Sequence, residues 1–402
     1  MKIRGSLAKG LLIALAISLI PVSAVSAPKI ISGGSCKVLN QKVVYQKKSY
    51  ICIKTDKKLV WKKGLAAVKP TPTPTKTITP AASLSLDNLR TRLDEVINSA
   101  WLQASKKITS SASTLGSIQN LVGPNTTEET SNSLAALSLA SKLFEGFPQV
   151  KNLYIIKFSS KDIDWAQKQY DQLSPNNYEP NAARNQCASN NGCVGAMAGI
   201  NAVGDGVVLM GQGGSYIGAP TVKGLTRAQN GLIVAHEYFH TIQAINAPCR
   251  GGRGCYGEAP QWLLEGGATW AAAAVLYSDS YDDYLTERNI TLNNHYLNAA
   301  STYTSDYINQ YLNPNPIFLP NQDNWKHWGK YNPREAYVLG FMVSEILASV
   351  KGPASLMKLY ADIGAGKSFV DAFQGIFGLS WAEACPIISE AISTELKEGI
   401  KK

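Results

Sequence analysis

The sequence predicts an α+β fold, in which a small β-rich module precedes a larger domain with its strands ahead of most of its helices. Three observations indicate this order. Residues 35–64 alternate apolar residues and lysines in short β-like runs, and residues 152–214 contain further strand-like runs. After Leu225 the spacing of apolar residues is mainly helical up to the end of the chain.

Residues 1–27 have the features of a secretory signal peptide. A positively charged start is followed by an apolar run over residues 10–20, which is too short to span a bilayer comfortably, and small residues end at Ala24 or Ala27. An N-terminal membrane anchor is the alternative. No later stretch is long and apolar enough to cross a membrane, so the sequence predicts a secreted, extracellular protein.

Cysteine usage points to the same oxidising compartment. Six of the seven cysteines lie in close pairs, and Cys385 is left over as a buried thiol. Metal binding is the alternative for the second and third pairs, but neither has CxxC spacing or a nearby histidine. The predicted disulfides are Cys36–Cys52, Cys187–Cys193 and Cys249–Cys255.

The formal net charge of +10 is concentrated near the N-terminus. Residues 28–76 carry twelve lysines against one acidic residue, Asp56, whereas residues 77–402 carry 24 basic and 28 acidic residues. The basic character therefore belongs to one small module, predicted at residues 28–64, and not to the whole chain. No nucleic-acid-binding motif accompanies it, and a basic segment alone is poor support for such a function.

This module resembles short, Cys-paired, Lys-rich modules of secreted actinobacterial proteins that end in sequences like "KLVWKKG". The resemblance covers about thirty residues and implies no established activity. Its lysines, with Tyr45, Tyr50 and Trp61, can bind a polyanion such as a cell-wall polymer. A solvated lysine face on a spacer module is the alternative.

Residues 65–83 form the predicted linker, because proline at alternate positions favours an extended, semi-rigid tether. Residues 84–402 are long enough for one large domain or for two lobes that share a cleft. Their first part predicts a helix over 86–108, and a strand over 152–160 followed by a helix over 161–173. A strand pair is predicted around residues 204–206.

The segment "LIVAHEYFHTIQ" contains two of the four histidines in the chain. On a helix, His236 and His240 project from one face about one turn, roughly 6 Å, apart, so both imidazoles can bind one Zn²⁺ ion. Glu237 can accept a proton from an attacking water without binding the metal. The helix itself is predicted from a buried stripe of apolar residues, namely Ala235, Tyr238, Ile242 and Ile245.

A third ligand is predicted in "APQWLLEGGATW", a second buried helix that begins near Pro260. Glu265 lies among apolar residues, where an unpartnered charge is costly and metal ligation would supply the partner. The small residues Gly266, Gly267 and Ala268 allow this helix to approach the histidine helix closely. A hydrogen-bonded carboxylate without a metal is the alternative for Glu265.

HExxH followed after 25 residues by the Glu of "WLLEGGATW" resembles the gluzincins, a clan of zinc metallopeptidases, and is nearer to the peptidase MA-like and aminopeptidase branches than to thermolysin. The resemblance extends over about residues 150–378 and implies a zincin-like domain with a mixed β-sheet lobe and a mainly helical C-terminal lobe. It implies that His236, His240 and Glu265 are zinc ligands and that Glu237 is the general base. One departure is Thr269, which stands where thermolysin-like members have a histidine-orienting aspartate.

The same resemblance implies two further features. The segment "YVLGFMVSEIL" is similar to the clan's Tyr-x-x-Gly helix, so Tyr337 is the candidate donor to the developing oxyanion, with Tyr331 second. An ordinary core tyrosine is the alternative, and His327 and His295 are weaker candidates. The strand over 206–211 is expected to pair with an extended substrate.

The expected activity is therefore zinc-dependent hydrolysis of peptide bonds by an endopeptidase. A GxMEN-like segment, which would capture a free amine, is absent, but a zinc aminopeptidase stays an alternative. A catalytically inactive, envelope-associated binding protein on the same scaffold and a non-peptide metallohydrolase are the others. Arg250 and Arg253 could favour acidic substrates, but solvated loop charges are the preferred explanation.

Overall fold

The chain forms two compact units, Met1–Ala81 and Ala82–Lys402. The predicted signal peptide, residues 65–82 of the predicted linker and the Cys249–Cys255 pair lie outside the described residues. The computed structural model describes residues 30–46, 48–56, 58–63, 83–127, 132–173, 175, 179–187, 192–193, 195–212, 222, 224–247, 259–294, 303–313 and 334–398.

The N-terminal unit contains a three-stranded antiparallel meander, β1 (Lys42–Tyr45), β2 (Lys48–Thr55) and β3 (Lys58–Lys63). The predicted Cys36–Cys52 disulfide is present and lies against a small core formed by Tyr50, Cys52 and Trp61. Tyr50 and Trp61 are each only 8% exposed. These two rings therefore serve as the core of the small sheet and leave little surface for contact with a partner.

In the second unit two short 3-10 helices, Leu89–Thr91 and Leu93–Glu95, precede α1 (Val96–Ser110), and a four-stranded mixed sheet follows in the order β4-β5-β7-β6. β4 pairs with β5 and β5 with β7 in parallel, whereas β6 is antiparallel to β7. The strands and the helices between them are β4 (Ser117–Val122), α2 (Ser133–Leu143), β5 (Asn152–Phe158), α3 (Ile163–Leu173), α4 (Ala182–Gln186), β6 (Ala196–Ile200) and β7 (Gly206–Gly211).

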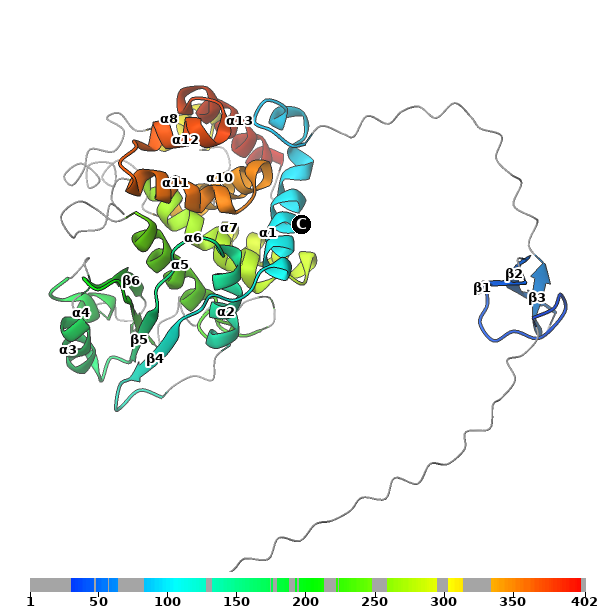
Figure 1. The fold of residues 1–402 in the computed structure, drawn as a ribbon, viewed down its shortest axis with the longest axis horizontal. Coiled ribbons are helices and arrows are strands. Elements are labelled where there is room, and N and C mark those ends of the chain that lie inside the picture. Colours follow the sequence, from blue (N-terminus) through cyan, green and yellow to red (C-terminus); the bar gives the residue numbers. More distant parts are fainter. Residues whose placement is uncertain are drawn as a thin grey trace, which may run out of the picture. The chain divides into compact units, whose positions relative to one another are not determined.

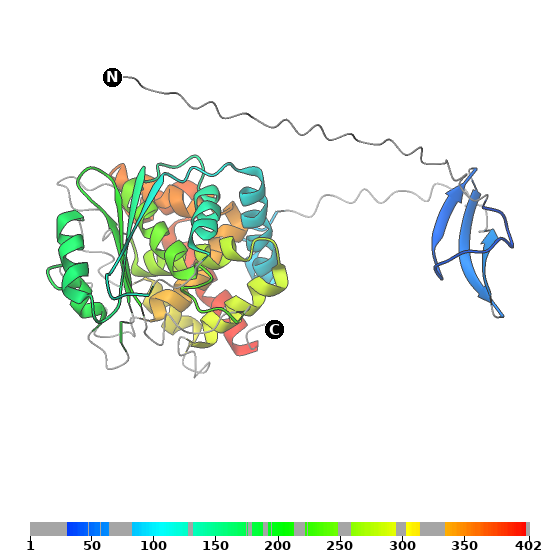
Figure 2. The same ribbon diagram turned by 90° about the horizontal axis from the view of Figure 1, so that it is seen from below.

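The strands separate two apolar layers. Ile156 and Phe158 on β5 face a core that they share with α3 and α4. Leu153 and Ile155, which alternate with them, belong to the large core of the helical region. Figure 2 shows the sheet nearly edge-on, between α3 on one side and the helical region on the other. Because both faces of the sheet are covered, β5 and β7 are nearly continuous apolar runs.

From Leu232 onward the described chain is helical, as predicted, so the α+β class is confirmed (Figure 1). Cys385 is a buried free thiol, also as predicted, and the Cys187–Cys193 disulfide is present. None of the described helices combines the length and apolar character of a transmembrane span. The helices are α5 (Leu232–Asn246), α6 (Gln261–Leu276), α7 (Tyr281–Asn294), α8 (Ser305–Leu312), α10 (Glu335–Lys351), α11 (Ala354–Gly364), α12 (Phe369–Phe377) and α13 (Trp381–Glu398).

The expectation that β7 pairs with substrate is wrong. β7 lies between β5 and β6, so both of its edges are occupied by other strands. All six of its residues are buried, which is typical of a central strand. Of the two outer strands, β6 is the one that packs against α5.

Candidate metal centre

Helix α5 crosses the interior of the larger unit, between the sheet and α6. It begins after Gly231, whose φ of 91° is a left-handed conformation that suits glycine. All of its residues are buried except His236 and Ile245. A helix with this burial has little freedom to shift, so the side chains on its α6-facing side are fixed in position.

Helix α6 supplies the third predicted ligand and crosses α10 at two glycines. A Cβ atom on Gly266 would lie 2.1 Å from the carbonyl carbon of Gly340, and one on Gly340 would lie 2.2 Å from the carbonyl oxygen of Trp262. Only glycine permits this backbone contact. It brings α10 against the turn of α6 that carries Glu265.

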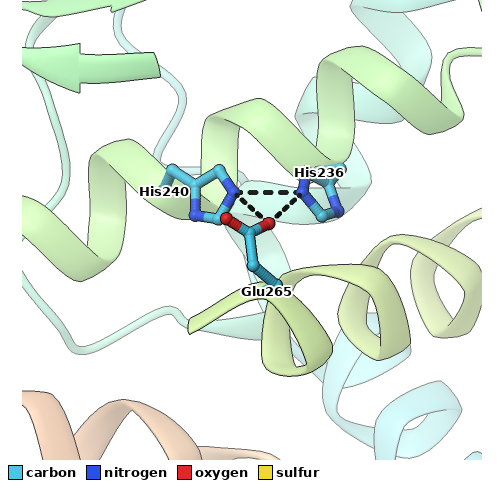
Figure 3. Close-up of side chains that lie close together, drawn as sticks. All are labelled: His236, His240 and Glu265. Atoms are coloured by element: carbon cyan, nitrogen blue, oxygen red, sulfur yellow. Dashed lines mark hydrogen bonds and ion pairs between the residues drawn. The ribbon is translucent and has the colours of Figure 1, made fainter. Parts of the chain in front are cut away.

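The side chains of His236, His240 and Glu265 converge as the sequence predicts (Figure 3). The two Nε2 atoms are 3.0 Å apart, and each lies 3.4 Å from Oε2 of Glu265. A tetrahedral zinc ion with bonds of about 2.0–2.1 Å holds its ligand atoms about 3.3–3.4 Å apart. The two distances to Glu265 match this spacing and the distance between the Nε2 atoms is shorter, so the three donor atoms are a group that could hold one metal ion.

The outer nitrogen atoms of both imidazoles face oxygen atoms. Nδ1 of His240 lies 2.8 Å from Oε1 of Gln243, and Nδ1 of His236 lies 3.4 Å from Oγ1 of Thr269. If each Nδ1 carries the proton and donates it outward, both Nε2 atoms present lone pairs to each other and to Glu265. Three such electron-rich atoms repel one another unless a proton or a metal cation lies among them.

The electrostatics of the metal-free site follow from this crowding. Burial opposes the charging of His240, but the Glu265 carboxylate outweighs it and raises the pKa of His240 to about 9. Burial likewise opposes ionisation of Glu265, yet its interactions with His240 and His236 hold its pKa far below the ordinary value. The cluster thus favours an anionic oxygen and a positive charge beside it.

Glu237 lies beside this cluster without belonging to it. Its side chain is buried, and its Oε2 atom has no hydrogen-bond partner among the described residues. Desolvation raises the pKa of Glu237, although the nearby His236 and His240 partly oppose the shift. A buried carboxylate oxygen without a partner is costly, and such groups are found where a proton is accepted or a ligand binds.

Tyr337, in the first turn of α10, contacts the cluster at His236. Its ring stacks on the imidazole of His236, with centroids 6.0 Å apart and an angle of 18° between the planes. The Tyr337–Gly340 spacing places this ring one turn before the glycine contact with α6. The other candidates, Tyr331, His295 and His327, and the loop arginines Arg250 and Arg253 lie outside the described residues.

Sequence reasoning missed Gln243, which is 3% exposed and touches the site through His240. The signal for it was weak, since a glutamine one turn beyond HExxH is also compatible with a solvated helix face. Comparison with known proteins gives no match to any family model, curated protein or solved structure.

Proposed function

We propose that this protein is an exported zinc-dependent peptidase, with His236, His240 and Glu265 as the metal ligands. The observation that carries the proposal is the convergence of the two Nε2 atoms and Oε2 at separations of 3.0 and 3.4 Å. The adjacent buried Glu237, with one carboxylate oxygen unpartnered among the described residues, supports it further.

When bound, zinc supplies a Lewis acid that polarises the scissile carbonyl and acidifies water. Glu237 accepts the proton of the attacking water, and its raised pKa suits it to hold that proton. Glu237 then donates the proton to the departing amine nitrogen. Tyr337 is the candidate donor of a hydrogen bond to the developing oxyanion.

The test is to measure zinc content and peptide hydrolysis for the wild type and for Glu237→Gln. We expect about one zinc ion per chain in both proteins, and a loss of turnover of at least about 10²-fold in the variant. Glu398→Gln, at the exposed end of α13, is the matched control and should hydrolyse normally. Undiminished hydrolysis by Glu237→Gln would contradict the role of Glu237.

The choice of substrate separates the competing activities. Cleavage of peptides blocked at the N-terminus indicates an endopeptidase, whereas cleavage restricted to free N-termini indicates the aminopeptidase alternative. A wild-type protein that binds zinc but cleaves neither kind of peptide would support the binding-protein or non-peptide alternatives. Export is tested by N-terminal sequencing of protein recovered from culture medium, which should begin near residue 25 or 28.

We also propose that the N-terminal module binds a polyanion through its lysines. The observation behind this is that Lys42 and Lys62 are both cross-strand neighbours of Ile51, so they lie on one sheet face, and both are exposed. Lys58, paired with Thr55, is on the same face. Residues 30–63 contain nine lysines and one acidic residue, so little within the module neutralises this charge.

Inorganic polyphosphate immobilised on resin is a suitable probe, with full-length protein eluted by a salt gradient. Replacing Lys42, Lys58 and Lys62 by glutamine should lower the eluting salt concentration. Unchanged elution would contradict the proposal and favour a spacer role. The matched control replaces three exposed lysines of the larger unit, namely Lys106, Lys151 and Lys168.

A further inference from the structure

Gln243 makes hydrogen bonds with groups on both ligand-bearing helices. It is on α5, three residues after His240, and its Oε1 lies 2.8 Å from Nδ1 of that imidazole. Its Nε2 donates a 3.0 Å hydrogen bond to the carbonyl oxygen of Leu264, the residue before Glu265 on α6. One buried amide thus contacts the ring of one proposed ligand and the backbone next to another.

The chemistry of these contacts fixes the direction of each bond. A backbone carbonyl only accepts, so the Gln243 atom that faces Leu264 must be the donor, Nε2. The atom that faces His240 is then the acceptor, Oε1, and the proton of a neutral His240 must lie on Nδ1. This leaves the lone pair of Nε2 directed toward Glu265 and His236.

Thr269 has the same relation to His236. Its hydroxyl donates its one proton to the carbonyl oxygen of Glu265 at 2.7 Å, so only its lone pairs face Nδ1 of His236 at 3.4 Å. Thr269 therefore contacts one proposed ligand and the backbone of another. In both cases the oxygen behind the imidazole is neutral.

From this geometry we infer that Gln243 and Thr269 are positioning residues of the metal site, an inference that rests on the proposed function. Gln243 orients His240 and holds α6 at the distance at which Glu265 meets the two imidazoles. Thr269 orients His236, and its longer contact gives it the smaller part. Both residues act through the ligands and touch neither metal nor substrate.

The prediction is that removing these contacts weakens metal binding more than it weakens the fold. Gln243→Met has a similar volume and removes both hydrogen bonds, and it should lower zinc affinity about 10–100-fold. Asn246→Leu is the matched control: Asn246 is also buried on α5 and bonds the carbonyl oxygen of Pro148 at 2.9 Å, but it touches no ligand. Its zinc affinity should stay within about twofold of the wild type, because the ligand orientation that sets affinity is untouched.

The measurement is competition for zinc with a chromophoric chelator, alongside urea denaturation of each metal-free protein. Cobalt substitution provides a second readout, because its visible absorption band depends on ligand geometry and should change in Gln243→Met but not in Asn246→Leu. If Gln243→Met fails to fold, the pair Thr269→Val and Thr269→Ser decides the matter. Only the valine variant, which lacks the hydroxyl, should bind zinc more weakly.

The outcomes separate the two proposals. A wild-type protein that binds no zinc overturns the proposed function and the inference together. A wild type that binds zinc, with the same affinity in Gln243→Met or in the valine variant used in its place, overturns the inference and leaves the metal site standing. Equal losses in Gln243→Met and Asn246→Leu would also overturn it, because they indicate a general effect on the fold.

Discussion

Two adjacent glycines on α6, Gly266 and Gly267, differ in the space around them: a side chain would clash at the first and fit at the second. They therefore form a matched pair of substitution sites. A Cβ atom at Gly266 would lie 2.1 Å from the carbonyl carbon of Gly340 on α10. At Gly267 the nearest atom would be Nε2 of Gln243 at 3.7 Å, an ordinary contact. Carbon atoms pack at about 3.5–4.0 Å, so Gly266→Ala requires α6 and α10 to separate by roughly 1 Å or more.

Alanine at Gly266 should lower the free energy of unfolding, whereas alanine at Gly267 should leave it unchanged or raise it. Forcing extra volume into a packed core costs about 1–3 kcal/mol, and Gly266→Ala should be at the upper end because both contacting groups are backbone. Gly267→Ala meets no clash and gains the helix propensity of alanine, up to about 1 kcal/mol. The first variant should also bind zinc more weakly, because Gly266 directly follows Glu265 in the sequence.

Urea denaturation of the two metal-free variants measures the free energies of unfolding, and chelator competition measures the zinc affinities. The reasoning requires Gly266→Ala to be less stable than the wild type and Gly267→Ala to be at least as stable. Equal stability of the two variants would refute the close contact between α6 and α10. Reduced stability of Gly266→Ala with unchanged zinc affinity would refute its connection to Glu265.

Three further predictions concern other parts of the chain. The pKa of His240 is raised to about 9 in the metal-free protein, so zinc binding at pH 8 should release about one proton from this residue. An ordinary histidine would release almost none at this pH. Calorimetry in buffers of different ionisation enthalpy measures the number of protons released. Arg288→Met should lower the free energy of unfolding by about 3–5 kcal/mol, since it leaves Glu345 buried without the guanidinium that now lies 2.7 Å away; a loss below about 1 kcal/mol would contradict this. Replacing Cys36 and Cys52 by serine should remove about 3 kcal/mol from the N-terminal module and abolish amide protection in β2, with zinc affinity of the larger unit unchanged.

The convergence of His236, His240 and Glu265 was predictable in part from local sequence. A helix brings residues four apart to one face, so the HExxH spacing alone aligns His236 and His240. Glu265 was predictable from a charge within an apolar helix, which needs a partner wherever that helix packs. The strands β5, β6 and β7 were predictable from short, nearly continuous apolar runs, with a turn signal at residues 204–206 between the last two.

Features set by tertiary contacts were not predictable in this way. β4, with the sequence SIQNLV, has no regular alternation and becomes a strand by pairing with β5. β7 lies inside the sheet because β5 and β6 both pair with it. No residue within β7 specifies that pairing. The family resemblance implied that the strand over 206–211 pairs with a substrate, whereas the sheet order places β7 between β5 and β6.

The distance between the ligand helices has the same non-local origin, and it decides whether the site can work. The histidines of HExxH on α5 and Glu265 on α6 can converge only if the two helices pack at the observed distance. The hydrogen bond from Gln243 to the carbonyl oxygen of Leu264 joins the two helices directly, and Gly266 lets α10 pack against α6 beside Glu265. A bulky residue in place of Gly266 would meet the backbone of Gly340, so we expect it to displace the turn of α6 that carries Glu265 while the HExxH motif itself is unchanged.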